Sequence, residues 1–109
     1  MPDIRLWPNA IRQAAKKLAD TVMAEMALED NRHNVKLSVI NQIMAAGDNR
    51  YTGKPHSFSS AETLATTEPA YLDYLERLRQ AAHDRIMARG EYDAVLAASR
   101  LAQENNVNG

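Results

Sequence analysis

Cysteine is absent from this sequence of 109 residues, and turn-forming and aromatic residues are scarce, with four glycines, four prolines and six aromatic side chains. Without cysteine there is no disulfide framework and no thiol chemistry. A chain that is rich in alanine and poor in aromatic residues suits long helices better than β-sandwiches. No apolar run approaches the ~18 residues of a membrane span, and the N-terminus has no basic start followed by an apolar core. We therefore expect no membrane segment, no signal peptide and a cytoplasmic location.

The net charge of −1 is divided unevenly between the two halves of the chain. Residues 1–58 carry eight Lys and Arg against six Asp and Glu, whereas residues 59–109 carry five against eight. The resulting field is weak, which argues against strong charge-driven binding to duplex nucleic acid. It leaves room for a local anion site in the more basic half.

The distribution of proline and glycine divides the chain, which we expect to form a single helical domain over residues 1–109. Neither residue type occurs between Pro8 and Gly47. Gly53 and Pro55 then forbid a regular helix. The predicted elements are a long helix over about 8–46, a loop over 47–59, a short helix over about 60–66, a second long helix over about 68–103 and a frayed tail over 104–109.

The first long helix is predicted from apolar residues that recur at helical spacing. They are Ile11, Ala15, Leu18, Val22 and Met26, with Ile40 and Met44 near the other end. Six consecutive polar residues, 29–34, interrupt this stripe for nearly two turns. We favour one continuous helix here; the alternative is that the helix bends or pauses at the polar run.

The capping signals and the second stripe place the remaining helices. Ser59 and Glu62 fit a capping box that starts the short helix, and Thr67 with Pro69 fits the start of the last one. The last helix carries an apolar face composed of Tyr71, Leu75, Leu78, Ala82, Ile86, Tyr92, Leu96 and Leu101. Gly90 lies inside this helix at a cost of ~1 kcal/mol relative to alanine, and it predicts a kink or a close helix contact.

Two long helices joined by a compact link should fold back as an antiparallel hairpin, so the predicted fold class is all-α. If Met44 lies beside Tyr71, Val22 lies beside Tyr92 or Asp93. The polar run then faces a second polar stretch across the hairpin. The residues of this predicted inter-helix polar belt are Glu29, Asp30, Arg32, His33, His83, Asp84, Arg85 and Arg89. Such a belt can set the register at some cost in stability, or its two halves can simply be solvated faces.

A two-helix hairpin buries one seam and leaves other apolar residues exposed. Those that we expect on an oligomer or partner surface are Leu28, Val35, Val39, Ile43, Leu72, Met87 and Val95. Further copies of the chain, or another protein, would cover them. The sequence therefore predicts a likewise helical assembly beyond the monomer.

Catalytic and metal-binding patterns are weak. His33 and His83 can face each other across the belt and hold a metal with Glu29 or Asp84, but no Cys, HExxH or His-x3-His spacing supports this. No nucleophile elbow, phosphate loop or dinucleotide fingerprint is present. We expect a protein that is not an enzyme and that needs neither a metal nor another cofactor.

The stretch around residues 50–58 is the one segment with binding character. It gathers Arg50, Tyr51, Lys54, His56 and Phe58 within nine residues. Arginine and lysine can neutralise phosphates, and exposed aromatic rings can stack on unpaired bases. The alternative is a structural loop in which Tyr51 and Phe58 pack on the helix ends and seal the hairpin.

The turn at Tyr51, Thr52 and Gly53, placed after a long N-terminal helix and before further helical segments, resembles that of the UvsY-type recombination mediators of tailed phages. The resemblance covers roughly residues 30–100. It implies a small, all-helical, oligomeric protein of a phage-infected bacterial host that binds single-stranded DNA and helps to load a RecA-like recombinase. Where that family carries basic residues before the turn, this chain has residues 44–48, and its nearest cations are Arg50 and Lys54.

Two functions follow as hypotheses. The first is a phage-type accessory protein that acts as an oligomeric helical protein-interaction module. The second is a single-stranded DNA-binding recombination mediator. The near-neutral charge favours the first, and the composition of the loop favours the second.

Overall fold

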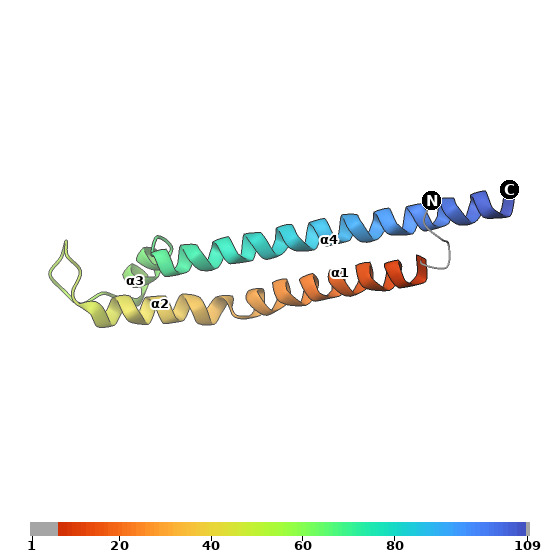
Figure 1. Ribbon diagram of the computed structural model, residues 1–109. Coiled ribbons are helices and arrows are strands. Elements are labelled where there is room, and N and C mark those ends of the chain that lie inside the picture. Colours follow the sequence, from red (N-terminus) through yellow and green to blue (C-terminus); the bar gives the residue numbers. More distant parts are fainter. Residues whose placement is uncertain (1–6, 109) are drawn as a thin grey trace. The chain divides into compact units, whose positions relative to one another are not determined.

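The computed structural model describes residues 7–108, and they form an all-α fold of the predicted hairpin type (Figure 1). The chain runs out along α1 and α2, turns through a loop and the short helix α3, and returns along α4. The helices are α1 (Trp7–Asp30), α2 (Arg32–Ala46), α3 (Phe58–Ala65) and α4 (Pro69–Asn108). Within the described residues no β-strand forms, and none of the helices is long and apolar enough to cross a membrane.

The chain divides into two compact units, where the sequence predicts one domain. Unit 1 comprises residues 1–26 and 81–109, and unit 2 comprises residues 27–80. Each unit has its own set of packed residues, and each is described by itself below.

Unit 2 contains a small core around the short helix α3. Ala61 and Ala65 of α3 are fully buried, and their small side chains let α3 pack closely on α2. The buried residues of this core are Val39, Ile40, Ala61, Ala65, Tyr71 and Tyr74. The prediction that Val39 lies on a partner surface is therefore wrong, because α3 covers that side of α2.

The first half of the hairpin consists of two helices rather than the predicted one. α1 ends at Asp30 and α2 begins at Arg32, so the break lies at Asn31, inside the polar run. At the break the Asn31 N–H donates to the Leu28 carbonyl at 3.2 Å, which is the tighter three-residue bond of a helix end. The hydroxyl of Tyr74 donates to the same carbonyl. The alternative interpretation, a pause at the polar run, is the one that the structure shows.

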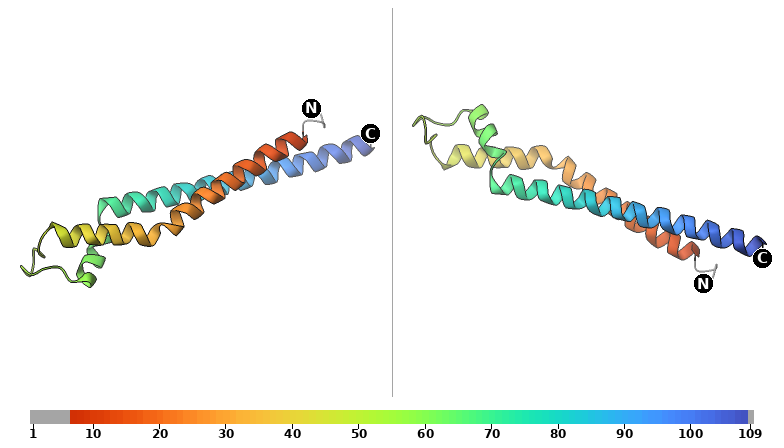
Figure 2. Two further views of the ribbon diagram at one scale, coloured as in Figure 1. Left: turned by 90° about the horizontal axis from the view of Figure 1, so that it is seen from below. Right: turned by 90° about the horizontal axis from the view of Figure 1, so that it is seen from above.

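Unit 1 is an antiparallel pair in which the N-terminal part of α1 lies beside the C-terminal part of α4 (Figures 1 and 2). The inward-facing residues are spaced by alternating steps of three and four, the 3.5-residue period of a left-handed coiled coil. They are Trp7, Ile11, Ala14, Leu18, Thr21 and Glu25 on α1, and Ala81, Arg85, Ala88, Tyr92, Val95, Ser99 and Ala102 on α4. We call this set the seam of unit 1.

The seam differs from the predicted one in its residues and in its register. Met26 and Ile86, predicted to face inward, are 51% and 59% exposed. Small and polar residues take those inward positions, which a search for large apolar side chains does not select. In the predicted register Glu25 lies opposite Gly90, whereas it contacts Arg85, five residues earlier.

The ends of the last two helices also differ from the prediction. α3 is capped by Ser57, whose Oγ accepts the Ser60 N–H at 3.1 Å, so the helix begins two residues before the predicted capping box. α4 continues to Asn108 through most of the predicted tail, without interruption at Gly90. A Cβ added at Gly90 would meet nothing within 4 Å, so the close helix contact predicted there does not come from the chain itself.

Candidate binding site

The loop between α2 and α3, residues 47–57, forms a short hairpin with its own hydrogen bonds. The Asn49 N–H donates to the Lys54 carbonyl, and the Gly53 N–H donates to the Asn49 carbonyl, both at 2.8 Å. The Asn49 side chain accepts the Tyr51 N–H at 2.8 Å, which is an Asx turn. Gly53 has a φ of 68°, a conformation that favours glycine. These bonds fix the loop without using the side chains of Arg50 and Tyr51.

The side chains with binding character project from this hairpin, which stands away from α2 and α3 in both views of Figure 2. Tyr51 is 89% exposed and Phe58 is 52% exposed. Arg50 and Lys54 are exposed as well, and neither forms an ion pair within the described part of the chain. The interpretation in which Tyr51 seals the hairpin is therefore wrong.

His56 has a different role from the other predicted loop residues. It is half-buried, and its Nδ1 lies 3.2 Å from the Oγ of Ser60. The Asn49 side-chain amide donates to the same Oγ at 3.4 Å. Ser60 thus links the loop to the first turn of α3, and His56 helps to hold the loop in place.

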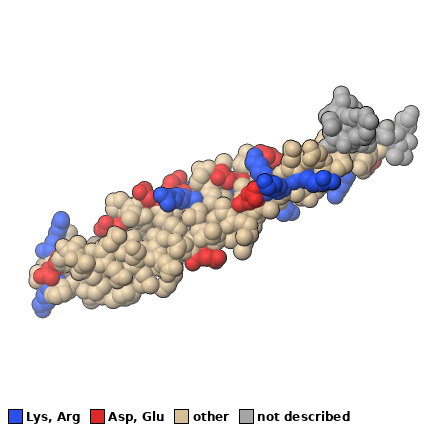
Figure 3. Space-filling model, turned by 60° about the horizontal axis from the view of Figure 1, so that its bottom comes forward, with Lys and Arg blue, Asp and Glu red and all other residues tan. Residues whose placement is uncertain are grey.

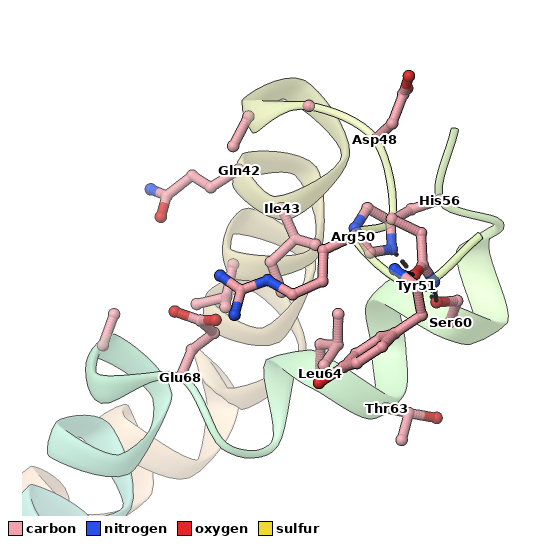
Figure 4. A pocket seen from close by; sticks show the side chains of 15 residues that line it. Gln42, Ile43, Asp48, Arg50, Tyr51, His56, Ser60, Thr63, Leu64 and Glu68 are labelled. Atoms are coloured by element: carbon pink, nitrogen blue, oxygen red, sulfur yellow. Dashed lines mark hydrogen bonds between the residues drawn. The ribbon is translucent and has the colours of Figure 1, made fainter. Parts of the chain in front are cut away.

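A pocket of about 850 Å³ lies beside the hairpin, between α2, the loop, α3 and the start of α4 (Figure 4). Ile43 and Leu64 supply apolar walls. Arg50 extends into the pocket from the loop, and Glu68 extends into it from the α3–α4 link. Tyr51 lies at the rim against α3, so the pocket combines apolar, aromatic and oppositely charged groups.

The sequence-predicted polar belt is divided between the two units, and its groups have partners within their own unit. In unit 2, Arg32 pairs with Glu29 at 3.3 Å, one helical turn away. In unit 1, Arg85 pairs with Glu25 at 3.0 Å, rather than with the predicted Glu29 or Asp30. The remaining contacts of unit 1 are local to α4, between His83 and Asp84 and between Arg89 and Asp93. Asp30 and His33 are exposed.

A tyrosine pair of α4 faces the break at Asn31. The rings of Tyr71 and Tyr74 are tilted, with their centroids 6.3 Å apart. Burial raises the pKa of Tyr74, and the carboxylate of Glu29 raises it further. The hydrogen bond with Tyr71 raises the pKa of Arg32, and the charge of Glu29 adds to this effect. The tyrosines therefore stabilise the polar run, a role that the sequence pattern does not reveal.

The predicted partner surface is only partly exposed. Leu28, Val35 and Ile43 are half-buried against the core of unit 2, and Val95 is half-buried in the seam of unit 1. Leu72 and Met87 are 48% and 54% exposed. The strongly exposed apolar residues of unit 1 that the sequence prediction missed are Met23, Met26 and Ile86, at 64%, 51% and 59%.

Comparison with known proteins gives no match: no family model fits the chain, and neither a curated protein nor a solved structure is similar to it. Within the described residues, no group of three or more His, Asp or Glu side chains lies close enough together to hold a metal ion.

Proposed function

We propose that the chain is a non-enzymatic helical protein-interaction module, an accessory protein of phage type that associates with itself and through its helices with a partner protein. The observation that carries this proposal is a second apolar stripe on α4, outside the seam. Its residues, which we call the outer stripe, are Met87, Gly90, Ala94, Ala97 and Leu101, and all five are exposed.

The spacing of the outer stripe supports helix packing. Its steps are three, four, three and four residues, the same period as the seam of unit 1. A scattered set of exposed apolar residues would need no explanation, but a continuous row over four turns at coiled-coil spacing favours another helix as its cover. Glycine and alanine in the middle of the row would let that helix approach closely.

The energetics of unit 1 point the same way. Its buried residues in the described part of the chain are Ala81, Ala88 and Ser99, none of them large. Tyr92 and Leu18 are only half-buried. Because most helical stability in proteins comes from burying an apolar face, a pair that buries so little gains from association.

The test is a charge placed in the outer stripe. Ala94→Glu should lower the mass of the assembly and leave the helical content unchanged. Gln103→Glu is the matched control, since it adds the same charge to an exposed residue on another side of α4. Multi-angle light scattering and circular dichroism measure the two quantities. Equal masses for both variants and the wild type would remove the outer stripe as the contact surface.

Binding of single-stranded DNA is the second candidate, and the presentation of the loop favours it. Arg50 and Lys54 are cations without ion-pair partners within the described residues, and they flank the exposed ring of Tyr51. Stacking of one base on such a ring is worth ~1–3 kcal/mol. Against it, positive and negative groups are interspersed on the face shown in Figure 3, without a broad basic stripe.

Fluorescence anisotropy with a labelled single strand at two salt concentrations tests this candidate. Each phosphate contact contributes ~0.7 to the log–log salt slope, so removal of both Arg50 and Lys54 should flatten the slope. Tyr51→Ala should weaken binding with little change in slope. A wild-type protein that ignores single-stranded DNA at low salt would eliminate DNA binding as a function.

A further inference from the structure

The pocket of unit 2 holds two opposite charges that are not paired with each other. Arg50 and Glu68 both line it, and neither makes an ion pair within the described residues. Ile43 and Leu64 form apolar walls between them (Figure 4). An occupant that satisfies this pocket must offer an acidic group to Arg50, a basic group to Glu68 and apolar atoms in between.

The charges of the pocket favour a protein segment over a polyanion. Glu68 and Asp48 both line the pocket, against the single guanidinium of Arg50. A nucleic acid strand brings one negative charge per nucleotide, so it would meet repulsion from two carboxylates. A short peptide of mixed charge meets no such cost, and each of its charges gains a partner.

The sequence itself contains a segment of the required chemistry. Residues 1–6 read Met-Pro-Asp-Ile-Arg-Leu, with Asp3 and Arg5 separated by one apolar residue. In an extended chain alternate side chains point to opposite sides, so Asp3 and Arg5 lie on one side and Ile4 and Leu6 on the other. The C-terminal residues 105–109 carry no charged side chain and do not match the pocket in this way.

We propose that the pocket of one chain binds residues 1–6 of a second copy, with Asp3 against Arg50 and Arg5 against Glu68. Ile4 and Leu6 turn toward Ile43 and Leu64, while the two ion pairs remain at the mouth of the pocket. The inference rests on the self-association proposed above and identifies a contact that contributes to it.

The ion pairs of this contact supply direction more than affinity. Arg50 is exposed and Glu68 is half-buried, so solvent screens both pairs. Charge pairs of this kind discriminate mainly against the wrong arrangement, in which like charges meet. The order of Asp3 and Arg5 along the segment should therefore matter more than their presence.

The experiment compares two peptides of identical composition and net charge. One is residues 1–6, acetylated at its N-terminus and labelled with fluorescein at its C-terminus; in the other, Asp3 and Arg5 are exchanged. Fluorescence anisotropy titrates each peptide with the wild-type protein and with the double variant Arg50→Glu, Glu68→Arg. We expect the wild type to prefer the natural peptide by about tenfold and the double variant to prefer the exchanged peptide.

Matched controls separate the pocket from the overall charge and from folding. Lys54→Glu with Glu62→Arg makes the same charge changes on residues that do not line the pocket, so its peptide preference should equal that of the wild type. Circular dichroism verifies that both double variants retain the helical content of the wild type. The exchange Asp3→Arg, Arg5→Asp in the full chain should lower the assembled mass in light scattering.

The outcomes keep this inference distinct from the proposed function. Equal affinity of the wild type for the two peptides overturns the assignment of the pocket and leaves self-association to the outer-stripe test. Selective peptide binding with an assembled mass that does not respond to the exchange overturns the contact between copies. A labelled single strand that competes with the natural peptide, and binds more tightly to Glu68→Gln, would assign the pocket to nucleic acid instead.

Discussion

The hydroxyl of Tyr74 donates a hydrogen bond to the backbone carbonyl of Leu28, one turn before the helix break at Asn31. At a helix end the last carbonyls lack partners within the helix and need others. Tyr74 supplies one from α4, and it is 6% exposed in the core of unit 2. The break in the polar run is thus stabilised by a tertiary contact.

Replacing Tyr74 with phenylalanine should destabilise the chain by about 1–2 kcal/mol, because the Leu28 carbonyl loses a buried donor while the ring is kept. Urea denaturation followed by circular dichroism measures the change. Tyr92→Phe is the control, since the hydroxyl of Tyr92 has no hydrogen-bond partner in the described residues. Equal stability of the two variants would contradict a role of the Tyr74 hydroxyl at the break.

Stability should fall at high pH partly through Tyr74. Burial raises the pKa of Tyr74 above its ordinary value of 10.0, so above that value the unfolded state loses this proton before the folded state does. The contribution is fully present below pH 10.0 and is lost as the pH rises through the folded-state pKa. Urea denaturation at about pH 8 and about pH 11 should show a smaller loss for Tyr74→Phe than for the wild type. An equal loss in both proteins would argue against this contribution.

The two ion pairs across the seam of unit 1 should differ in strength. The side chains of Arg85 and Glu25 are 38% and 22% exposed, whereas those of Lys17 and Glu91 are 59% and 50% exposed. Double-mutant cycles should therefore give a coupling of about 1–2 kcal/mol for the first pair and below about 0.5 kcal/mol for the second. Equal couplings would mean that solvent screens both pairs alike.

Gly90→Ala should change stability and association in opposite directions. A Cβ there meets nothing in the chain itself, so alanine should stabilise α4 by about 0.5–1 kcal/mol in dilute solution. In the assembly the added methyl group would separate the packed helices and weaken association. Thermal denaturation at low concentration and light scattering at high concentration measure the two effects. Association that strengthens together with stability would speak against close packing at Gly90.

Local patterns in the sequence were sufficient to predict the helices and the hairpin. Helical spacing predicts both long segments, and Gly53 with Pro55 locates the loop between them. The binding character of the loop was also visible in its composition. That Tyr51 is exposed was not, because the Asx turn of Asn49 fixes the loop without using the ring, and composition does not show this.

The remaining features depend on contacts between segments that are distant in the sequence. Val39 is buried because α3 folds over α2, and Ala61 and Ala65 give no sign of this from their own pattern. The pocket was missed for the same reason, since Ile43, Leu64 and Glu68 come from three different elements. The register was misjudged because the seam uses small and polar residues, and a register shift of a few residues leaves the apolar count nearly the same.

The mass of the wild-type chain in solution tests the central claim most directly. Sedimentation equilibrium over a wide range of micromolar concentrations should show a mass above the 12.2 kDa of one chain and rising with concentration. Unfolding should then also depend on concentration, because association stabilises the folded chain. A mass of 12.2 kDa at every concentration, together with a sharp and concentration-independent transition, would contradict self-association as the basis of this protein's function.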